Sequence, residues 1–185
     1  MKYLIYIMTL LPVYQLVVVP SAIDPYDLWL EITGVWAIIW LSLVLVSGPL
    51  GRFNRRFNPL TYGRKPIGLS VATWMALHIA GYFIFHQSFK QSLIDLISKP
   101  FLVIGLVAAV IFMAMAITSS WNVLKMIGPQ SWKVLHGAIT TASAFVVGHG
   151  LTAQKVVTTD AGKFILILLL ALIIRYNLEF WRVKK

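Results

Sequence analysis

The chain has 185 residues, of which 59% are hydrophobic and only 12% are charged, and its formal net charge is +10 at pH 7. Long apolar stretches recur along it, which is typical of a multi-pass membrane protein and excludes an ordinary soluble domain. The basic residues lie between these stretches, and no aromatic–basic stripe of the kind found on nucleic-acid-binding surfaces is present. Cysteine is absent, so disulfides, zinc–thiolate sites and iron–sulfur clusters are excluded. Any redox chemistry would therefore need a bound cofactor.

Six apolar segments are predicted to form an all-α bundle of six transmembrane helices. Each is close to the ~20 residues that cross a hydrocarbon core. They run from about residues 3 to 19, 32 to 50, 67 to 85, 101 to 117, 132 to 151 and 164 to 181. The first segment could instead be a signal peptide, but the residues after it make a poor cleavage site, and we expect a retained helix. No hydrophilic stretch is long enough to fold separately, so residues 1–185 are expected to form one membrane domain.

The charges between the segments predict the orientation in the membrane. With six spans, twelve basic residues fall on one side: Lys2, Arg52, Arg55, Arg56, Arg64, Lys65, Lys125, Lys133, Arg175, Arg182, Lys184 and Lys185. The other side receives four, which are Lys90, Lys99, Lys155 and Lys163. Because basic loops stay in the cytoplasm, both termini are expected to be cytoplasmic.

Three histidines lie inside the apolar segments, His78 in the third and His136 and His149 in the fifth. An ionisable residue at that depth is costly and marks a functional site by default. Paired imidazoles from adjacent helices can bind a haem iron from its two faces. Lys65 precedes His78 by the same thirteen residues that separate His136 from His149. Since both helices run outward, His78 and His149 are expected at one level, nearer the outer face.

His136 is expected on a different level from the other two histidines. Thirteen residues correspond to ~20 Å along a helix and a rotation of about 140°, so His136 and His149 can face one seam only if the helix is distorted. Gly137, Gly148 and Gly150 are candidate places for a distortion. The pattern favours one haem between His78 and His149 and leaves a second haem at His136 possible. The alternative is that these histidines only hydrogen-bond neighbouring helices.

Other polar residues have simpler interpretations beside functional ones. His86, at the edge of the third segment, could compete with His78 but is expected at the membrane interface. Glu31 could relay protons or bind a quinol, and is also expected at the interface. The arginines at 52, 55, 56 and 64 could hold a flavin phosphate or a quinone carbonyl, although membrane topology already explains them. No G-x-G-x-x-G follows a strand, so electrons must come from a separate protein or a membrane quinol.

Several stretches resemble the ferric-reductase-like transmembrane family. They are KPFLVIG, AMAITSS and GPQSWKVLH, with a second histidine thirteen residues after the first. The ITG of the second segment, the SGPLGR at its end and GRKPIGLSVATWMALHIAGY around His78 fit the same pattern. The resemblance covers about residues 31 to 155. Within the family, the chain is most similar to haem-binding membrane subunits of bacterial periplasmic methionine sulfoxide reductase systems.

This resemblance implies an inner-membrane b-type cytochrome with haem-binding histidines at His78, His136 and His149. Such subunits take electrons from a cytoplasmic flavin reductase or the quinol pool and pass them to a periplasmic molybdenum enzyme. Flavin mononucleotide is a further possible cofactor. Wider relatives have a fourth histidine where this sequence has Arg64 and Lys65, which agrees with a single bis-histidine site. Three alternatives remain: a metal-reducing cytochrome with another acceptor, a cofactor-free small transporter or assembly factor, and a haem-transfer protein.

Overall fold

A computed structural model describes residues 13–17, 21, 23–57, 61–85, 88–153 and 160–183, and every element named in these ranges is helical. The elements are α2 (Tyr14–Val17), α3 (Pro25–Phe53), the 3-10 helix η3 (Arg55–Phe57), α5 (Arg64–Phe85), α6 (Phe89–Ser98), α7 (Pro100–Ile117), α8 (Trp121–Gly137), α9 (Ile139–Thr152) and α10 (Asp160–Val183). The predicted all-α fold is confirmed.

Four stretches among the described residues are long and apolar enough to cross a membrane: α3, α5, α7, and Trp121–Thr152, which contains α8 and α9. They contain the second to fifth predicted segments, but α3 begins seven residues earlier than predicted and the last stretch eleven residues earlier. Helix α10 covers the sixth. The first predicted segment lies mostly outside the described residues, apart from α2. The count of six spans and the side of the termini therefore stay predictions.

The helix starts follow from local sequence. Asp24 caps α3, since its side chain accepts a hydrogen bond from the Asp27 backbone N–H at 3.0 Å, and Pro25 takes the first helical position, where no N–H is needed. Pro100 likewise takes the first helical position of α7. Ser120 caps α8 by accepting from the Val123 N–H at 3.3 Å. These local interactions therefore determine the residues at which α3, α7 and α8 begin.

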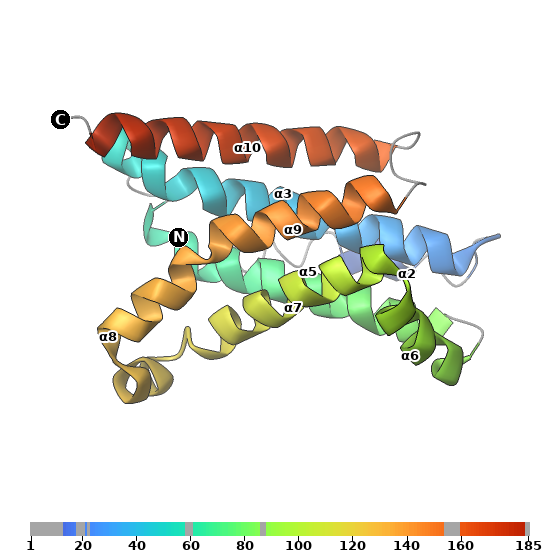
Figure 1. The fold of residues 1–185 in the computed structure, drawn as a ribbon. Coiled ribbons are helices and arrows are strands. Elements are labelled where there is room, and N and C mark those ends of the chain that lie inside the picture. Colours follow the sequence, from blue (N-terminus) through green and yellow to red (C-terminus); the bar gives the residue numbers. More distant parts are fainter. Residues whose placement is uncertain are drawn as a thin grey trace.

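The long helices pack in neighbouring pairs (Figure 1). Helix α3 packs along α5 on one side and α10 on the other, and α7 packs along α9. The short helix α6 lies at the end of the bundle opposite to α8 and to the C-terminal end of α10 (Figure 1). The core between the pairs holds the fully buried side chains of Leu41, Leu45, Trp74 and Leu168.

Helix α7 exposes six large apolar side chains, which are Val103, Leu106, Val107, Val110, Met113 and Ile117. A surface of that kind is stable beside lipid tails and costly in water. The small residues Ala108 and Ala109 are instead buried, where they allow close packing against neighbouring helices. The exposure pattern is thus that of a protein surrounded by lipid.

The fifth predicted segment is not one continuous helix. Helix α8 ends at Gly137, and Ala138, with ψ of −5°, separates it from α9. A second break lies within α8, where Gly128 has φ of +80° just before Pro129. Glycine adopts that φ at little cost, and proline removes a helical N–H. The chain is thus distorted between His136 and His149, next to Gly137, which is one of the three places where the sequence would allow a distortion.

Candidate histidine site between α5 and α9

The structure brings together the two histidines that the sequence placed at one level. His78, on α5, and His149, near the end of α9, have ring centres 6.4 Å apart, and their ring planes make an angle of 88°. Both side chains are half-buried. Two helices far apart in sequence thus present one imidazole each to a common centre.

His78 is held by α3. Its Nδ1 lies 3.1 Å from the Leu30 carbonyl oxygen and 3.2 Å from Thr33 Oγ1. The Thr33 hydroxyl donates to the Trp29 carbonyl at 2.7 Å, so its oxygen is available as an acceptor. Because a carbonyl can only accept, Nδ1 must carry the proton, and the lone pair of the neutral ring is on Nε2.

His149 is held by α7 in the same way. Its Nδ1 lies 2.7 Å from the Phe101 carbonyl oxygen, which again requires a proton on Nδ1. The Phe101 ring stacks against the imidazole, with centres 5.9 Å apart and planes 29° apart. Both histidines therefore keep the same tautomer, with Nε2 as the nitrogen that can bind a metal.

A reciprocal pair of interhelical bonds fixes the register of α3 against α5 beside His78. The Trp29 indole Nε1 donates to the Leu77 carbonyl at 2.8 Å, while His78 donates to the carbonyl of Leu30. Gly81 makes room for the indole, since a Cβ there would overlap the Trp29 ring. Two adjacent residues of α3, Trp29 and Leu30, are thus hydrogen-bonded to two adjacent residues of α5, Leu77 and His78.

The geometry suits two ligands on opposite sides of one metal. Two imidazoles that each bind a metal through Nε2 at about 2 Å place their ring centres roughly 6 Å apart, close to the separation observed here. Within the described ranges, no group of three or more His, Asp or Glu side chains could hold a metal ion. The pair offers two ligands, so a metal bound there would need its remaining ligands from another source.

His136 does not join this pair. Its ring stacks on Trp132 of its own helix, with centres 4.0 Å apart, and its Nδ1 lies 3.1 Å from the Trp132 carbonyl. His86 lies outside the described residues.

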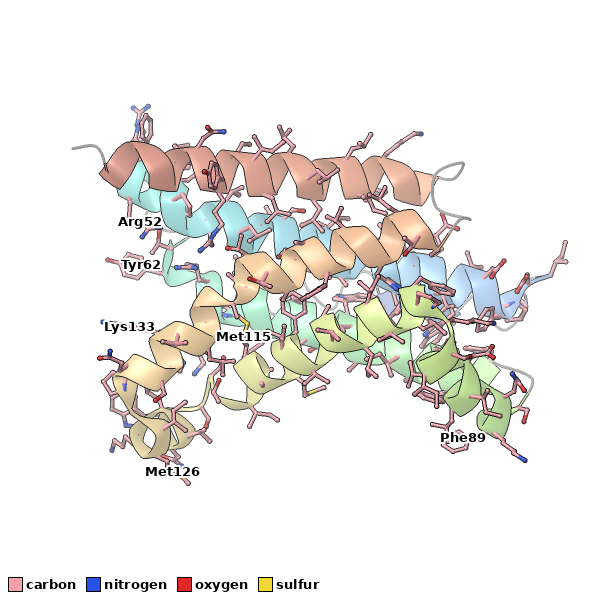
Figure 2. The ribbon with its side chains drawn as sticks, in the orientation of Figure 1. Arg52, Tyr62, Phe89, Met115, Met126 and Lys133 are labelled. Atoms are coloured by element: carbon pink, nitrogen blue, oxygen red, sulfur yellow. The ribbon has the colours of Figure 1, made fainter. Side chains whose placement is uncertain are left out.

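The remaining polar candidates lie at the periphery or within packing contacts. Glu31 and Arg52 are exposed, whereas the Arg64 guanidinium lies against Gly48 of α3, where a Cβ would be only 2.9 Å from Nη1. Arg52 and Lys133 lie at one end of the molecule and Phe89 at the other (Figure 2). Arg52 and Lys133, which the charge pattern predicts on the same side of the membrane, thus lie at the same end of the molecule.

Arg175 is a polar residue that the sequence analysis assigned only to topology. Its side chain is buried, with 9% of its surface exposed, and its Nη1 donates to the Leu45 carbonyl at 3.4 Å. The sequence did contain a signal for this burial. Arg175 directly follows a long apolar run, and an ionisable residue within such a run marks a functional or packing site. Thr33, Gly34 and Gly105 were also missed, because contacts between helices cannot be read from one helix alone.

The fold and the histidine pair define a multi-pass helical membrane protein with a histidine centre between its helices. The chain belongs to the family described as ferric reductase like transmembrane component, whose model matches residues 33–148. This confirms the family resemblance seen in the sequence.

The curated relatives share one name, protein-methionine-sulfoxide reductase heme-binding subunit MsrQ. The protein of that name from Herminiimonas arsenicoxydans is 28% identical over 128 residues, which cover 68% of this chain and 58% of the relative. The one from Pectobacterium atrosepticum is 27% identical over 165 residues, covering 86% of this chain and 81% of the relative. The one from Klebsiella pneumoniae is 26% identical over the same shares. These identities extend along most of the chain.

Proposed function

We propose that this protein is a haem-binding electron-transfer subunit of the bacterial inner membrane. It passes electrons from a cytoplasmic flavin reductase or the quinol pool to a periplasmic, molybdenum-dependent methionine sulfoxide reductase. Family membership and the name shared by its relatives support this proposal. The observation that carries it is the apposition of the His78 and His149 rings inside the bundle.

The residues present fit a haem b. The porphyrin surrounds the iron with four nitrogens, so the protein needs to supply only two axial ligands, from opposite sides. His78 and His149 are two such ligands, on different helices, with both Nδ1 atoms engaged by carbonyls. When bound there, haem would supply a carrier that gains and loses single electrons.

The chain's own residues would then tune and orient the site. The hydrogen bonds from Nδ1 to the Leu30 and Phe101 carbonyls fix each ring and raise the basicity of its Nε2. Apolar side chains on the surrounding helices exclude water. With six spans and cytoplasmic termini, the pair lies nearer the outer face, on the side of the periplasmic acceptor.

His136 is the candidate ligand for a second, inner haem. Its Nδ1 is engaged by the Trp132 carbonyl, so its Nε2 is also the nitrogen available for a metal. At the matching level of α5, thirteen and fourteen residues before His78, the sequence has Lys65 and Arg64 and no histidine. Flavin mononucleotide would be an additional cofactor, to which we assign no residues.

The test is a dithionite-reduced minus oxidised visible spectrum of the purified protein, with haem quantified per chain. A sharp b-type signal is expected in the wild type, and either His78→Ala or His149→Ala should remove the signal of the haem held between these two residues. His136→Ala is the comparison: an unchanged haem content would limit the protein to one haem, and loss of half would establish the second. A colourless wild-type protein from haem-replete cells would overturn the proposal in favour of a cofactor-free transporter or assembly factor.

The acceptor is tested separately, with the reduced protein mixed with a purified periplasmic methionine sulfoxide reductase. Rapid reoxidation that requires this enzyme and a sulfoxide substrate is expected. Reoxidation by ferric chelates alone, with no response to the enzyme, would instead make the protein a metal-reducing cytochrome.

A further inference from the structure

The two apposed histidines are held by the same local arrangement, used twice. His78 bonds to the carbonyl of Leu30 on α3, and His149 bonds to the carbonyl of Phe101 on α7, and the sequence separation is 48 residues in both cases. One helical turn after each carbonyl residue stands a glycine, Gly34 on α3 and Gly105 on α7. Each glycine lies against the ring of the histidine concerned.

The glycines have a geometric reason to be there. In a helix, the carbonyl of one residue already accepts the N–H four residues later, so an imidazole must use its second lone pair. Side chains of a helix lean towards its N-terminus and cover the preceding turn. A side chain at Gly105, or one larger than alanine at Gly34, would therefore cover the carbonyl that the histidine must reach.

The contact is tighter at Gly105 than at Gly34. A Cβ at Gly105 would lie 2.8 Å from His149 Nδ1 and 3.0 Å from its Cε1. The imidazole ring would have to move away from α7 to relieve this overlap. A Cβ at Gly34 would lie 3.4 Å from His78 Cε1, which is ordinary contact. The Thr33 hydroxyl gives His78 a second acceptor, whereas the hydrogen bond to Phe101 is the contact that engages Nδ1 of His149.

We propose that Gly34 and Gly105 are positioning residues that hold His78 and His149, through the uncovered carbonyls of Leu30 and Phe101, in the tautomer and orientation that direct both Nε2 atoms at one cofactor. The α3–α5 and α7–α9 pairs then act as two equivalent halves of the site. The role in cofactor binding rests on the proposed haem function. The control of tautomer and ring orientation does not.

The main test is Gly105→Ala, compared with Gly148→Ala. Gly148 is next to His149, but its added Cβ would meet only Ile104 Cγ2 at an ordinary 3.7 Å. Gly105→Ala is expected to weaken haem affinity about tenfold or more, as loss of a ligand-orienting contact does. Gly148→Ala should bind haem like the wild type. Equal haem affinity in all three proteins would overturn the proposal.

Gly34→Ala and Gly34→Val extend the test to the other half. The alanine should retain haem, because its Cβ fits, while the valine, whose methyl groups extend towards the ring, should lose it. Gly68→Val is the control on α5, since a Cβ there would meet nothing within 4 Å. Circular dichroism and gel filtration of each variant in detergent show that it is folded. Haem loss by Gly68→Val equal to that of Gly34→Val would contradict the positioning role.

A readout without haem separates this inference from the proposed function. The chain has four histidines, so ¹⁵N chemical shifts of histidine-labelled apoprotein can assign the tautomer of each ring. Protonated Nδ1 is expected at His78 and His149 in the wild type, and Gly105→Ala should remove it at His149 alone. This result in a chain that binds no haem would leave the positioning role standing while the haem function fails. Nδ1 protonation unchanged in Gly105→Ala would overturn the positioning role.

Discussion

The ring planes of His78 and His149 are almost perpendicular, at 88°, with centres 6.4 Å apart. This angle is imposed by different helices, since the Leu30 carbonyl orients one ring and the Phe101 carbonyl the other. Each ring is thus oriented before any cofactor joins them. The relative orientation of two axial imidazoles is measurable, and it provides the first prediction.

The oxidised protein is expected to show a strongly anisotropic low-spin signal in electron paramagnetic resonance, with one large g value. Perpendicular imidazole planes leave two iron d orbitals close in energy, whereas parallel planes separate them and give a rhombic signal. The measurement is a low-temperature spectrum of the air-oxidised, haem-loaded protein. A rhombic signal of full intensity would show that the two rings do not keep this angle around haem.

Thr33→Val is expected to raise the midpoint potential while leaving haem bound. The fully buried Thr33 hydroxyl accepts from His78 Nδ1, which makes the ligand more basic and favours ferric iron. Because the Leu30 carbonyl remains, the rise should be modest, about 20–40 mV in a redox titration. Thr73→Val, at an exposed position on α5, is the control and should leave the potential unchanged. A lower potential in Thr33→Val would contradict this account of the hydrogen bond.

Trp29→Phe is expected to loosen the α3–α5 register. The change removes the indole hydrogen bond to the Leu77 carbonyl but keeps an aromatic ring near Phe85. We expect a loss of about 1 kcal/mol in the free energy of unfolding, measured by detergent titration with circular dichroism. Trp121→Phe, at a residue that is 63% exposed, should cost much less. Equal stability of the two variants would show that the bond does not fix the register.

The part of the site that follows from periodicity and spacing could be predicted from the sequence. Equal spacing of Lys65 to His78 and of His136 to His149 placed His78 and His149 at one level, and the structure has their rings in contact range. The fourth predicted segment, residues 101 to 117, matches α7 to within one residue. These features follow from the position of each residue within its own segment and from the direction in which the segments run.

The side-chain contacts made where two helices pack together could not be predicted. That Gly105 uncovers the carbonyl to which His149 bonds is visible only once α7 and α9 are packed together. The burial of Arg175 likewise results from the packing of α10 on α3. Helix α6 was missed for another reason: it is short, and its apolar residues face outward instead of into the bundle.

Helix α6 has the reverse of a soluble helix's burial pattern. Ser92 is fully buried and Asp95 is 7% exposed, and Asp95 pairs with Lys99 at 2.6 Å. The Tyr82 hydroxyl of α5 donates to the Ser92 carbonyl, which ties α6 to the bundle. The apolar side chains of Phe89, Leu93, Ile94 and Ile97 are exposed instead. An amphipathic helix with this exposure is stable lying in the membrane interface, with its apolar face in the lipid.

Spin labels on α6 are therefore expected to report lipid on its apolar face and water beside that face. Because the chain contains no cysteine, Ile97→Cys and Gln91→Cys each give a single labelling site. Residues 91 and 97 lie about 120° apart around the helix, and the polar residue Gln91 is exposed. In proteoliposomes, the label at 97, where the native side chain is 75% exposed, should relax with dissolved oxygen and little with a water-soluble nickel chelate. The label at 91 should respond to the chelate. If the label at 97 responds to the chelate as strongly as the label at 91, α6 stands in water and its apolar face is not a membrane contact.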